Sequence, residues 1–280
     1  MDRLRTPLLG AWAVLALVYL FIPIAVVIAF SFNDPAGRFN LTWEGFTLDH
    51  WTHPFAVEGL GEAFKNSLLI ALVATLIAVA LGTAMALALV RYRFRGRAPL
   101  DFFVFLPLAT PEVVLGAALL GLFITMNTET GFATIVVAHV MFSVSYVVVT
   151  MRARLEGMDR YIEEAARDLG ANGFDTFRLV TLPLIAPGVA AAALLTFALS
   201  VDDFVITNFT AGQTSTFPLF IWGASRQGVP PQVNVLATML LLAVLALMAL
   251  NVGWQRRRAR ADASAAVEPA RAAVQPGLAQ

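Results

Sequence analysis

The sequence predicts an all-α integral membrane protein with six transmembrane helices. Of its 280 residues, 59% are hydrophobic and 14% are charged, and the mean hydropathy is +0.75. A soluble domain of this length could hardly hide so much apolar surface from water. The apolar residues form six runs of about 20 residues, the length of helix that crosses the ~30 Å hydrocarbon core of a bilayer. The runs are residues 8–30, 68–90, 100–124, 132–150, 184–204 and 233–254.

The first run, residues 8–30, follows Arg3 and Arg5 and so has the charge pattern of a signal peptide. It is about twice the usual length of a signal core and lacks a small-x-small cleavage site, so we interpret it as a retained span. The mixed segment 31–65 contains aromatic residues that suit the membrane interface. These are Trp43, Trp51, Phe55 and Phe64.

The distribution of positive charge predicts the orientation of the chain. With the N-terminus inside, only three of the 19 Lys and Arg residues, Arg38, Lys65 and Arg226, fall outside. Cytoplasmic segments carry the excess of Lys and Arg in membrane proteins, so both termini are expected in the cytoplasm of a bacterial inner-membrane protein. Arginines that flank spans are topology signals, and we therefore expect no nucleic-acid partner. The stretch 255–280 is rich in Ala, Arg and Pro without an apolar period and is expected to be a disordered tail.

A polar interruption of about 30 residues separates the fourth and fifth runs, and it includes a loop at 152–183. Asp159 can cap a helix from Arg160 to Ala171, and Asn172-Gly173 is the expected stop because both residues tolerate the left-handed conformation. Such a helix would be about 18 Å long, which is too short to cross a bilayer. It therefore lies outside the membrane, either as a docking element for another protein or as an ordinary interfacial helix.

This loop resembles the EAA signature of the permease subunits of ABC importers. Glu164-Ala165-Ala166 is followed after three residues by Gly170 and after nine more by Val180-Thr181-Leu182-Pro183. The departure is Val180, where the signature has Ile. In that family the loop is the coupling helix that sits in a groove of the cytoplasmic ATPase. The residues expected to couple to the ATPase are Glu163, Glu164, Ala165, Ala166, Arg167, Gly170, Leu182 and Pro183.

Three carboxylates in or beside apolar runs are candidates for a substrate path. Glu112 lies near the middle of the third run, where a charge costs about 3 kcal/mol on insertion scales and should not face lipid. It either lines a path or is a buried structural acid, and Pro107 and Pro111 predict a bent or opened helix beside it. Asp202 and Asp203 end the fifth run, where an acid opposes the helix dipole. They are either solvated helix ends or a site for a cationic substrate.

The region around these aspartates resembles the second, C-type permease of spermidine/putrescine importers. The similar stretches are Leu199 to Thr207, Thr216 to Leu219 and Gln227 to Asn234, with Ser31-Phe32-Asn33 and Asn66-Ser67 earlier in the chain. The departures are Val201, Asn208 and Pro231-Gln232, and the last removes a possible acidic contact.

The resemblance implies the type I ABC importer permease fold and a set of partners. These would be a homologous second permease, a dimer of cytoplasmic ATPase subunits and an extracytoplasmic substrate-binding protein. Transport would follow alternating access, and the ligand must bind the two states differently for ATP to drive it. The chain has no G-x-x-x-x-G-K-[ST] loop, so it is not expected to hydrolyse ATP, and no cofactor is expected.

Three alternatives remain open from the residues alone. An intramembrane enzyme would need a nucleophile or a metal site, but the chain has no cysteine, and His50, His53 and His139 are scattered without an H-E-x-x-H motif. An ion-coupled transporter could use Glu112 or Asp202 as a proton site but would be expected to show two related halves. An ABC permease for iron, thiamine or a phosphonate would carry the same docking loop.

Overall fold

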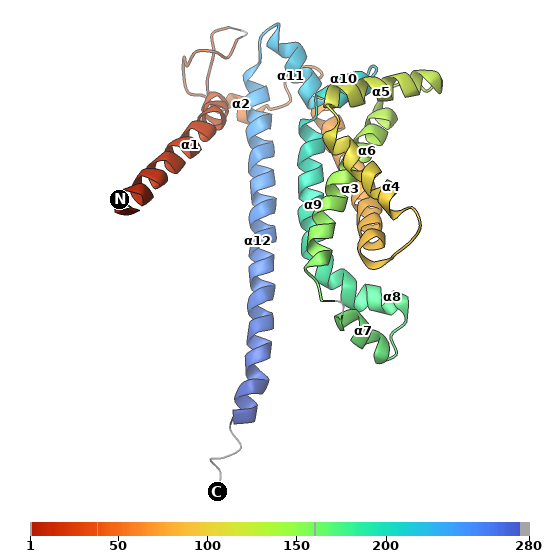
Figure 1. Ribbon diagram of the computed structural model, residues 1–280. Coiled ribbons are helices and arrows are strands. Elements are labelled where there is room, and N and C mark those ends of the chain that lie inside the picture. Colours follow the sequence, from red (N-terminus) through yellow and green to blue (C-terminus); the bar gives the residue numbers. More distant parts are fainter. Residues whose placement is uncertain (1, 38, 160, 275–280) are drawn as a thin grey trace. The chain divides into compact units, whose positions relative to one another are not determined.

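The computed structural model describes residues 2–37, 39–159 and 161–274, and these residues are almost entirely helical (Figure 1). The elements are α1 (Asp2–Phe30), α2 (Asp49–Thr52), α3 (Leu60–Arg91), α4 (Arg97–Ala109), α5 (Glu112–Thr125), α6 (Phe132–Glu156), α7 (Tyr161–Asp168), α8 (Gly173–Thr176), the π-helix η1 (Phe177–Thr181), α9 (Leu182–Asp202), α10 (Val205–Thr210), α11 (Phe217–Ser225) and α12 (Pro231–Val274). Arg38 and Arg160 lie outside the described residues.

Five stretches of helix in the described part of the chain are long and apolar enough to cross a membrane. They are Leu9–Phe30, Leu60–Arg91, Phe132–Glu156, Gly173–Asp202 and Pro231–Gly253. Each contains most of one predicted run. The third run forms two helices instead, and the count reaches six when that pair is taken as one span.

The third run is broken where the two prolines predicted a bend. The chain bends by 111° between α4 and α5, and Thr110, the last residue before Pro111, is extended. A proline disfavours the helical conformation in the residue before it, which explains why α4 ends there. Pro107 lies inside α4 and does not end it. With 13 and 14 residues, neither helix alone reaches the ~30 Å that a span requires.

The chain divides into two compact units, each built from three separate stretches. The first comprises Met1–Ile70, Gly116–Ile135 and Val201–Leu242, and the second comprises Ala71–Leu115, Val136–Ser200 and Ala243–Gln280.

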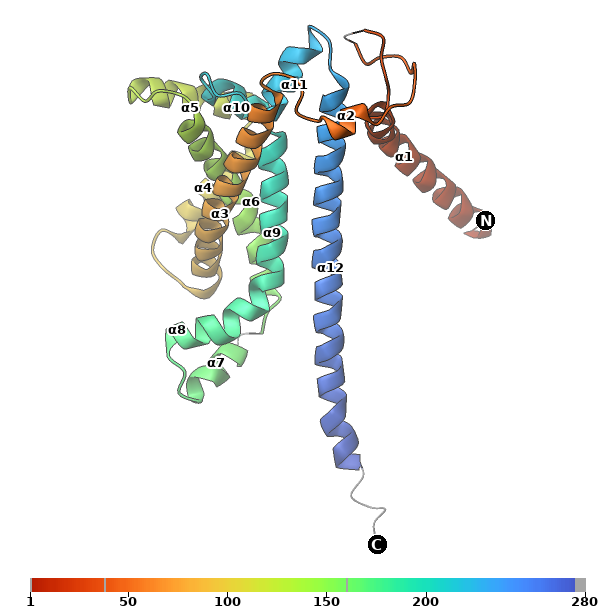
Figure 2. The same cartoon turned by 180° about the vertical axis from the view of Figure 1, so that it is seen from behind.

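The second unit is held together by α3, α6 and α9, which run side by side in both views (Figures 1 and 2). Its core contains Leu89 of α3, Val147 and Met151 of α6, and Ile185 of α9, all fully buried. α3 and α6 approach each other closely at Gly82, which has no side chain. A Cβ atom there would lie 2.6 Å from Cβ of Val147. An ion pair of 2.6 Å between Arg152 and Asp101 joins α4 to α6.

The first unit contains the loop that follows α1 and an aromatic core. Asn33 is fully buried; its amide donates to Asn40 Oδ1 and to the Thr42 carbonyl, both at 2.7 Å. Phe32 stacks on Phe46 and on Trp51. This segment, expected only to rest partly at the interface, therefore has a folded structure of its own.

A second cluster in the first unit joins α3 to α11 and α12 through Leu60, Phe217 and Leu236. Ser67 Oγ accepts a hydrogen bond from the backbone N–H of Phe217 at 2.8 Å, and the Asn66 amide donates to the Ser215 carbonyl at 3.0 Å. The Asn66-Ser67 pair thus fixes the start of α11.

The C-terminal stretch differs from the sequence-based expectation. α12 continues to Val274, so residues 255–274 are helical where a disordered tail was expected, and residues 275–280 lie outside the described residues. Ala and Arg dominate this stretch and are strong helix formers, so a helix already started at Pro231 continues through it. The sequence-based expectation rested on the missing apolar period of residues 255–280 and did not take their helix propensity into account.

Candidate functional site

The helix α7 begins where the sequence predicted. Asp159 Oδ1 accepts a hydrogen bond from the backbone N–H of Tyr161 at 2.9 Å. Such a bond satisfies one of the N–H groups that have no partner in the first turn of a helix. The predicted cap is confirmed.

The helix ends earlier than predicted, at Gly170 rather than at Asn172-Gly173. Gly170 has a φ of +92°, its N–H bonds the Arg167 carbonyl, and the N–H of Ala171 bonds the Ala166 carbonyl. This pair of bonds is the Schellman motif, in which glycine is strongly favoured because it has no Cβ. The EAA-x-x-x-G spacing therefore places the glycine at the stop of α7.

Asn172 begins the next helix instead of ending α7. Its Oδ1 accepts from the backbone N–H of Asp175 at 2.9 Å, and its amide donates to the Asp175 carboxylate at 2.6 Å. Asparagine serves helix starts as well as helix stops, which explains the misplaced boundary. The chain thus turns at Gly170 into α8.

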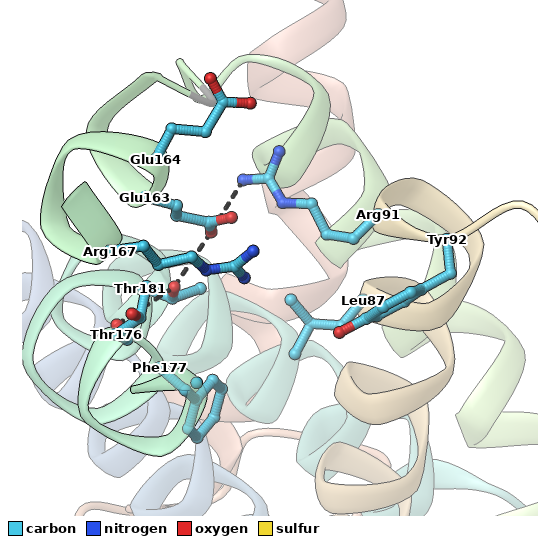
Figure 3. A pocket seen from close by; sticks show the side chains of 10 residues that line it. Leu87, Arg91, Tyr92, Glu163, Glu164, Arg167, Thr176, Phe177 and Thr181 are labelled. Atoms are coloured by element: carbon cyan, nitrogen blue, oxygen red, sulfur yellow. Dashed lines mark hydrogen bonds and ion pairs between the residues drawn. The ribbon is translucent and has the colours of Figure 1, made fainter. Parts of the chain in front are cut away.

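Glu163 points toward the body of the chain rather than outward. Its Oε1 lies 3.1 Å from Arg91 Nη2 and 3.0 Å from Thr181 Oγ1, as Figure 3 shows. The side chains of Arg91 and Glu163 are only 11% and 12% exposed. The sequence analysis grouped Glu163 with the residues expected to face the ATPase. Only the contacts with Arg91 and Thr181, which are distant in the sequence, distinguish Glu163 from Glu164.

A cavity of about 260 Å³ lies beside this ion pair. Leu87 and Arg91 of α3 form one wall, and Glu163, Glu164 and Arg167 of α7 form another (Figure 3). Arg167 points into this cavity.

The outer surface of α7 and α8 is exposed, and it includes two residues that also line this cavity, Glu164 and Arg167. Glu164, Ala165, Arg167 and Gly170 are exposed, and Ala166 is half-buried. The apolar side chain of Leu169 is 90% exposed, that of Tyr161 is 75% exposed and that of Phe174 is 68% exposed. A helix that leaves charged and apolar side chains uncovered together has the composition of a docking surface.

A π-helical turn joins the loop to α9. η1 ends at Thr181, and Leu182 and Pro183, both exposed, begin α9. Proline has no backbone N–H and so leaves one carbonyl of the preceding turn without its usual donor; the wider turn accommodates this. The Leu-Pro end of the signature thus lies at the entrance to the fifth predicted span.

α9 is also fixed to α6 near this entrance, by residues that the sequence analysis did not single out. Arg154 donates to the Leu184 carbonyl at 2.9 Å, and a Cβ on Gly188 would lie 2.8 Å from Arg154 Cγ. The Pro187-Gly188 pair inside an apolar run was the available signal.

Glu112 is not buried in mid-helix. It is the first residue of α5 and is exposed in this chain. A carboxylate at a helix N-terminus is favoured by the helix dipole. This chain alone does not bury Glu112, and both the structural role and the role in a substrate path stay predictions.

Asp203 has a structural partner that the sequence analysis missed. Its Oδ2 accepts from the Thr207 backbone N–H at 2.8 Å and from the Thr207 hydroxyl at 2.7 Å. The acid that opposes the dipole of α9 therefore caps the start of α10, which supplies the reason for its position. Asp202, the last residue of α9, is exposed.

The histidines form no catalytic cluster in the described part of the chain. His139 is buried, and its Nδ1 lies 2.6 Å from Ser200 Oγ, consistent with the expected packed polar residue. His53 lies beside Asp49 on the surface, and His50 lies near Gln232. No group of three or more His, Asp or Glu side chains among the described residues could hold a metal ion.

These features define a multi-pass helical membrane protein with a capped extramembrane helix linked to a span. The profile of the family described as binding-protein-dependent transport system inner membrane component matches residues 61–260. The chain belongs to this family, whose members are permease subunits of ABC transporters. This membership supports the ABC permease reading over the enzyme and ion-coupled alternatives.

Curated relatives cover nearly the whole chain. The spermidine/putrescine transport system permease protein PotC of Escherichia coli is 38% identical over 240 residues, which are 85% of this chain and 90% of PotC. The putrescine transport system permease protein PotI of Escherichia coli is 36% identical over 248 residues, 86% of this chain and 88% of PotI.

A solved structure confirms the fold. A bacterial ABC transporter involved in the import of the acidic polysaccharide alginate aligns with a TM-score of 0.69 at 16% identity, covering 91% of this chain and 97% of that chain. The predicted type I ABC importer permease fold is therefore correct.

Proposed function

We propose that this chain is the polyamine permease of an ATP-driven importer, most similar in role to the second permease of spermidine/putrescine systems. The observation that carries the proposal is identity of 36–38% to PotC and PotI of Escherichia coli over at least 85% of the chain. The motif stretches around Asp202 and Asn66, quoted from the sequence alone, support the same substrate class. An iron, thiamine or phosphonate permease would carry the same docking loop, so the loop alone does not choose among these substrates.

The exposed face of α7 and α8 would bind the cytoplasmic ATPase dimer. Glu164, Ala165 and Arg167 on α7, with the exposed Leu169 and Phe174, offer charge and apolar surface together. Gly170 and the half-buried Ala166 keep the backbone of this face accessible, because neither carries a long side chain. Leu182 and Pro183 would pass the movement of the docked loop into α9.

The chain would work with two further partners. A homologous second permease would cover apolar helix surface, and an extracytoplasmic binding protein would deliver the substrate. One relative in fold is the bacterial alginate ABC transporter in complex with an alginate pentasaccharide-bound periplasmic protein, with a TM-score of 0.66. Lipid would cover the remaining apolar surface, including α1, whose apolar window is 0% buried within the chain.

The mechanism would be alternating access driven from outside the chain. ATP would close the ATPase dimer, α7 would move with it, and the span bundle would open outward. Hydrolysis would take place on the ATPase subunits, and this chain would supply the path. Both termini would lie in the cytoplasm, with α7 on the side where ATP is available.

Glu112, Asp202 and Asp203 would attract the cationic substrate. Polyamines carry several ammonium groups, and each carboxylate can accept charge-assisted hydrogen bonds from one. Glu112 and Asp202 are exposed in this chain and so have room for a ligand. Asp203 would contribute its charge while it caps α10.

Uptake by the whole transporter tests this function. The chain would be co-expressed with an ATPase, a second permease and a binding protein from the same organism, and the complex reconstituted in proteoliposomes. We expect uptake of radiolabelled spermidine or putrescine that requires ATP inside the vesicles. Uptake of thiamine or ferric ion in place of polyamines would contradict the substrate, and uptake without the ATPase would contradict the mechanism.

A further inference from the structure

One carboxylate joins four elements at the base of the docking loop. Glu163 of α7 contacts Arg91, the last residue of α3, at 3.1 Å and Thr181, the last residue of η1, at 3.0 Å. The Thr181 hydroxyl has a second, longer acceptor at 3.4 Å in the carbonyl of Thr176 of α8. Figure 3 shows these contacts in one line from Arg91 to Thr176.

The burial of this cluster makes its geometry demanding. Thr181 is 4% exposed, and the Arg91 and Glu163 side chains are 11% and 12% exposed. Charges removed from water are tolerated only when they stay paired and hydrogen-bonded, so separating either partner leaves an uncompensated charge. The end of α3, the body of α7 and the start of α9 are therefore held at fixed distances from one another.

The neighbouring carboxylate has the opposite surroundings. Glu164 is exposed, whereas Glu163 is directed inward on the same turn of α7. The two glutamates of the Glu163-Glu164 pair thus face different environments, and only Glu164 is available to a docked partner.

We propose that Arg91, Glu163 and Thr181 form a positioning cluster that transmits movement of α7 to both α3 and α9. This inference rests on the proposed function, since it needs an ATPase to move α7. Glu163 acts through Arg91 and Thr181 and does not touch the ATPase. The π-helical turn is the joint of this linkage, because a π-helical turn is a point where the hydrogen-bond ladder of a helix is already shifted.

The number of spermidine molecules imported per ATP hydrolysed measures this linkage. In the complete transporter in proteoliposomes, Glu163→Gln keeps an acceptor for Thr181 and removes the charge that holds Arg91. We expect this ratio to fall at least about threefold, within the range by which single residues change coupling. The ATPase should still co-purify with the variant, because the docking face is intact.

The matched control is Glu156→Gln, at a carboxylate 62% exposed and 3.9 Å from Arg152. An exposed pair at this distance contributes little, so the ratio should stay at the wild-type value. Thr181→Val, which removes only the hydroxyl, should also lower the ratio. If the Glu163→Gln transporter does not assemble, Thr181→Val provides the test of the positioning cluster. The double variant Arg91→Glu with Glu163→Arg should recover part of the ratio.

The outcomes separate this inference from the proposed function. Absence of ATP-dependent spermidine uptake in the wild type would overturn the proposed function itself. A normal wild type in which Glu163→Gln and Thr181→Val match Glu156→Gln would overturn the positioning cluster alone. Weaker ATPase binding with an unchanged ratio in the complexes that still form would also overturn it, because Glu163 would then belong to the docking face.

Discussion

Two short helices, α7 and α10, each have a hydrogen-bonded carboxylate at or beside them, Glu163 and Asp203. The two carboxylates make different kinds of contact. Glu163 joins residues 72 and 18 positions away in the sequence. Asp203 accepts hydrogen bonds from the backbone N–H groups of Ile206 and Thr207, three and four positions away. The first contact fixes separate helices to one another, and the second closes a local turn. A charged side chain at a motif position can therefore organise tertiary structure or only its own helix end, and its partners decide which.

The largest effect is expected at Gly170, the stop of α7. In Gly170→Arg a side chain must adopt a φ of +92°, at a strain of about 1–2 kcal/mol, and must project from the docking face. We expect complete loss of polyamine uptake and of ATPase co-purification, while the chain still inserts in the membrane.

Gly170→Asn is the control for the backbone conformation, because asparagine tolerates positive φ better than other side chains. It should keep most ATPase binding. Equal loss in both variants would point to the backbone stop alone, and normal ATPase binding by Gly170→Arg would remove this position from the docking face.

The second effect separates Glu164 from Glu163. Glu164→Lys reverses an exposed charge, so the thermal midpoint of the purified chain should stay unchanged. Uptake should fall at least about tenfold, since a reversed charge at an interface costs several kcal/mol. Glu163→Lys should instead lower the thermal midpoint, because it places a second cation beside the buried Arg91. Unchanged uptake by Glu164→Lys would argue against docking through this residue.

The third effect concerns Asp203, whose two roles can be separated by substitution. Asp203→Asn keeps a capping oxygen for Thr207 but removes the charge, whereas Asp203→Ala removes both. We expect both variants to reduce spermidine uptake several-fold, and only Asp203→Ala to lose about 1 kcal/mol of stability. Normal uptake by Asp203→Asn would leave this residue with the capping role alone.

The smallest effect is expected at Gly188, where α9 approaches Arg154. A Cβ in Gly188→Ala would lie 2.8 Å from Arg154 Cγ, so Arg154 must move and its bond to the Leu184 carbonyl weakens. A loss of about 1–2 kcal/mol in thermal stability is expected from this overpacking. Gly121→Ala is the control, because a Cβ there meets nothing within 4 Å.

Sequence reasoning predicted what depends on local pattern. The spans follow from runs of apolar residues, the Asp159 cap follows from residue type, and the break after α4 follows from Pro111. The stop of α7 was placed two residues late, because Gly170 and Asn172 carry the same local signal and only the hydrogen bonds distinguish them.

Other features needed tertiary contacts. The inward direction of Glu163 depends on Arg91, which is far away in the sequence, and nothing in the Glu163-Glu164 pair tells one acid from the other. Asp203 was weighed as a solvated helix end or a substrate site, but not as a cap for the next helix, where its partner Thr207 lies. The helical stretch 255–274 was missed because composition was judged by apolar period alone.

The most direct test of the account is the sidedness of α7. The chain has no cysteine, so Leu169→Cys, at a side chain 90% exposed, introduces a single reactive thiol. A membrane-impermeant maleimide should label it in inside-out vesicles and not in right-side-out vesicles, and the bound ATPase should protect it. Labelling from the extracytoplasmic side, or equal labelling with and without the ATPase, would contradict the account.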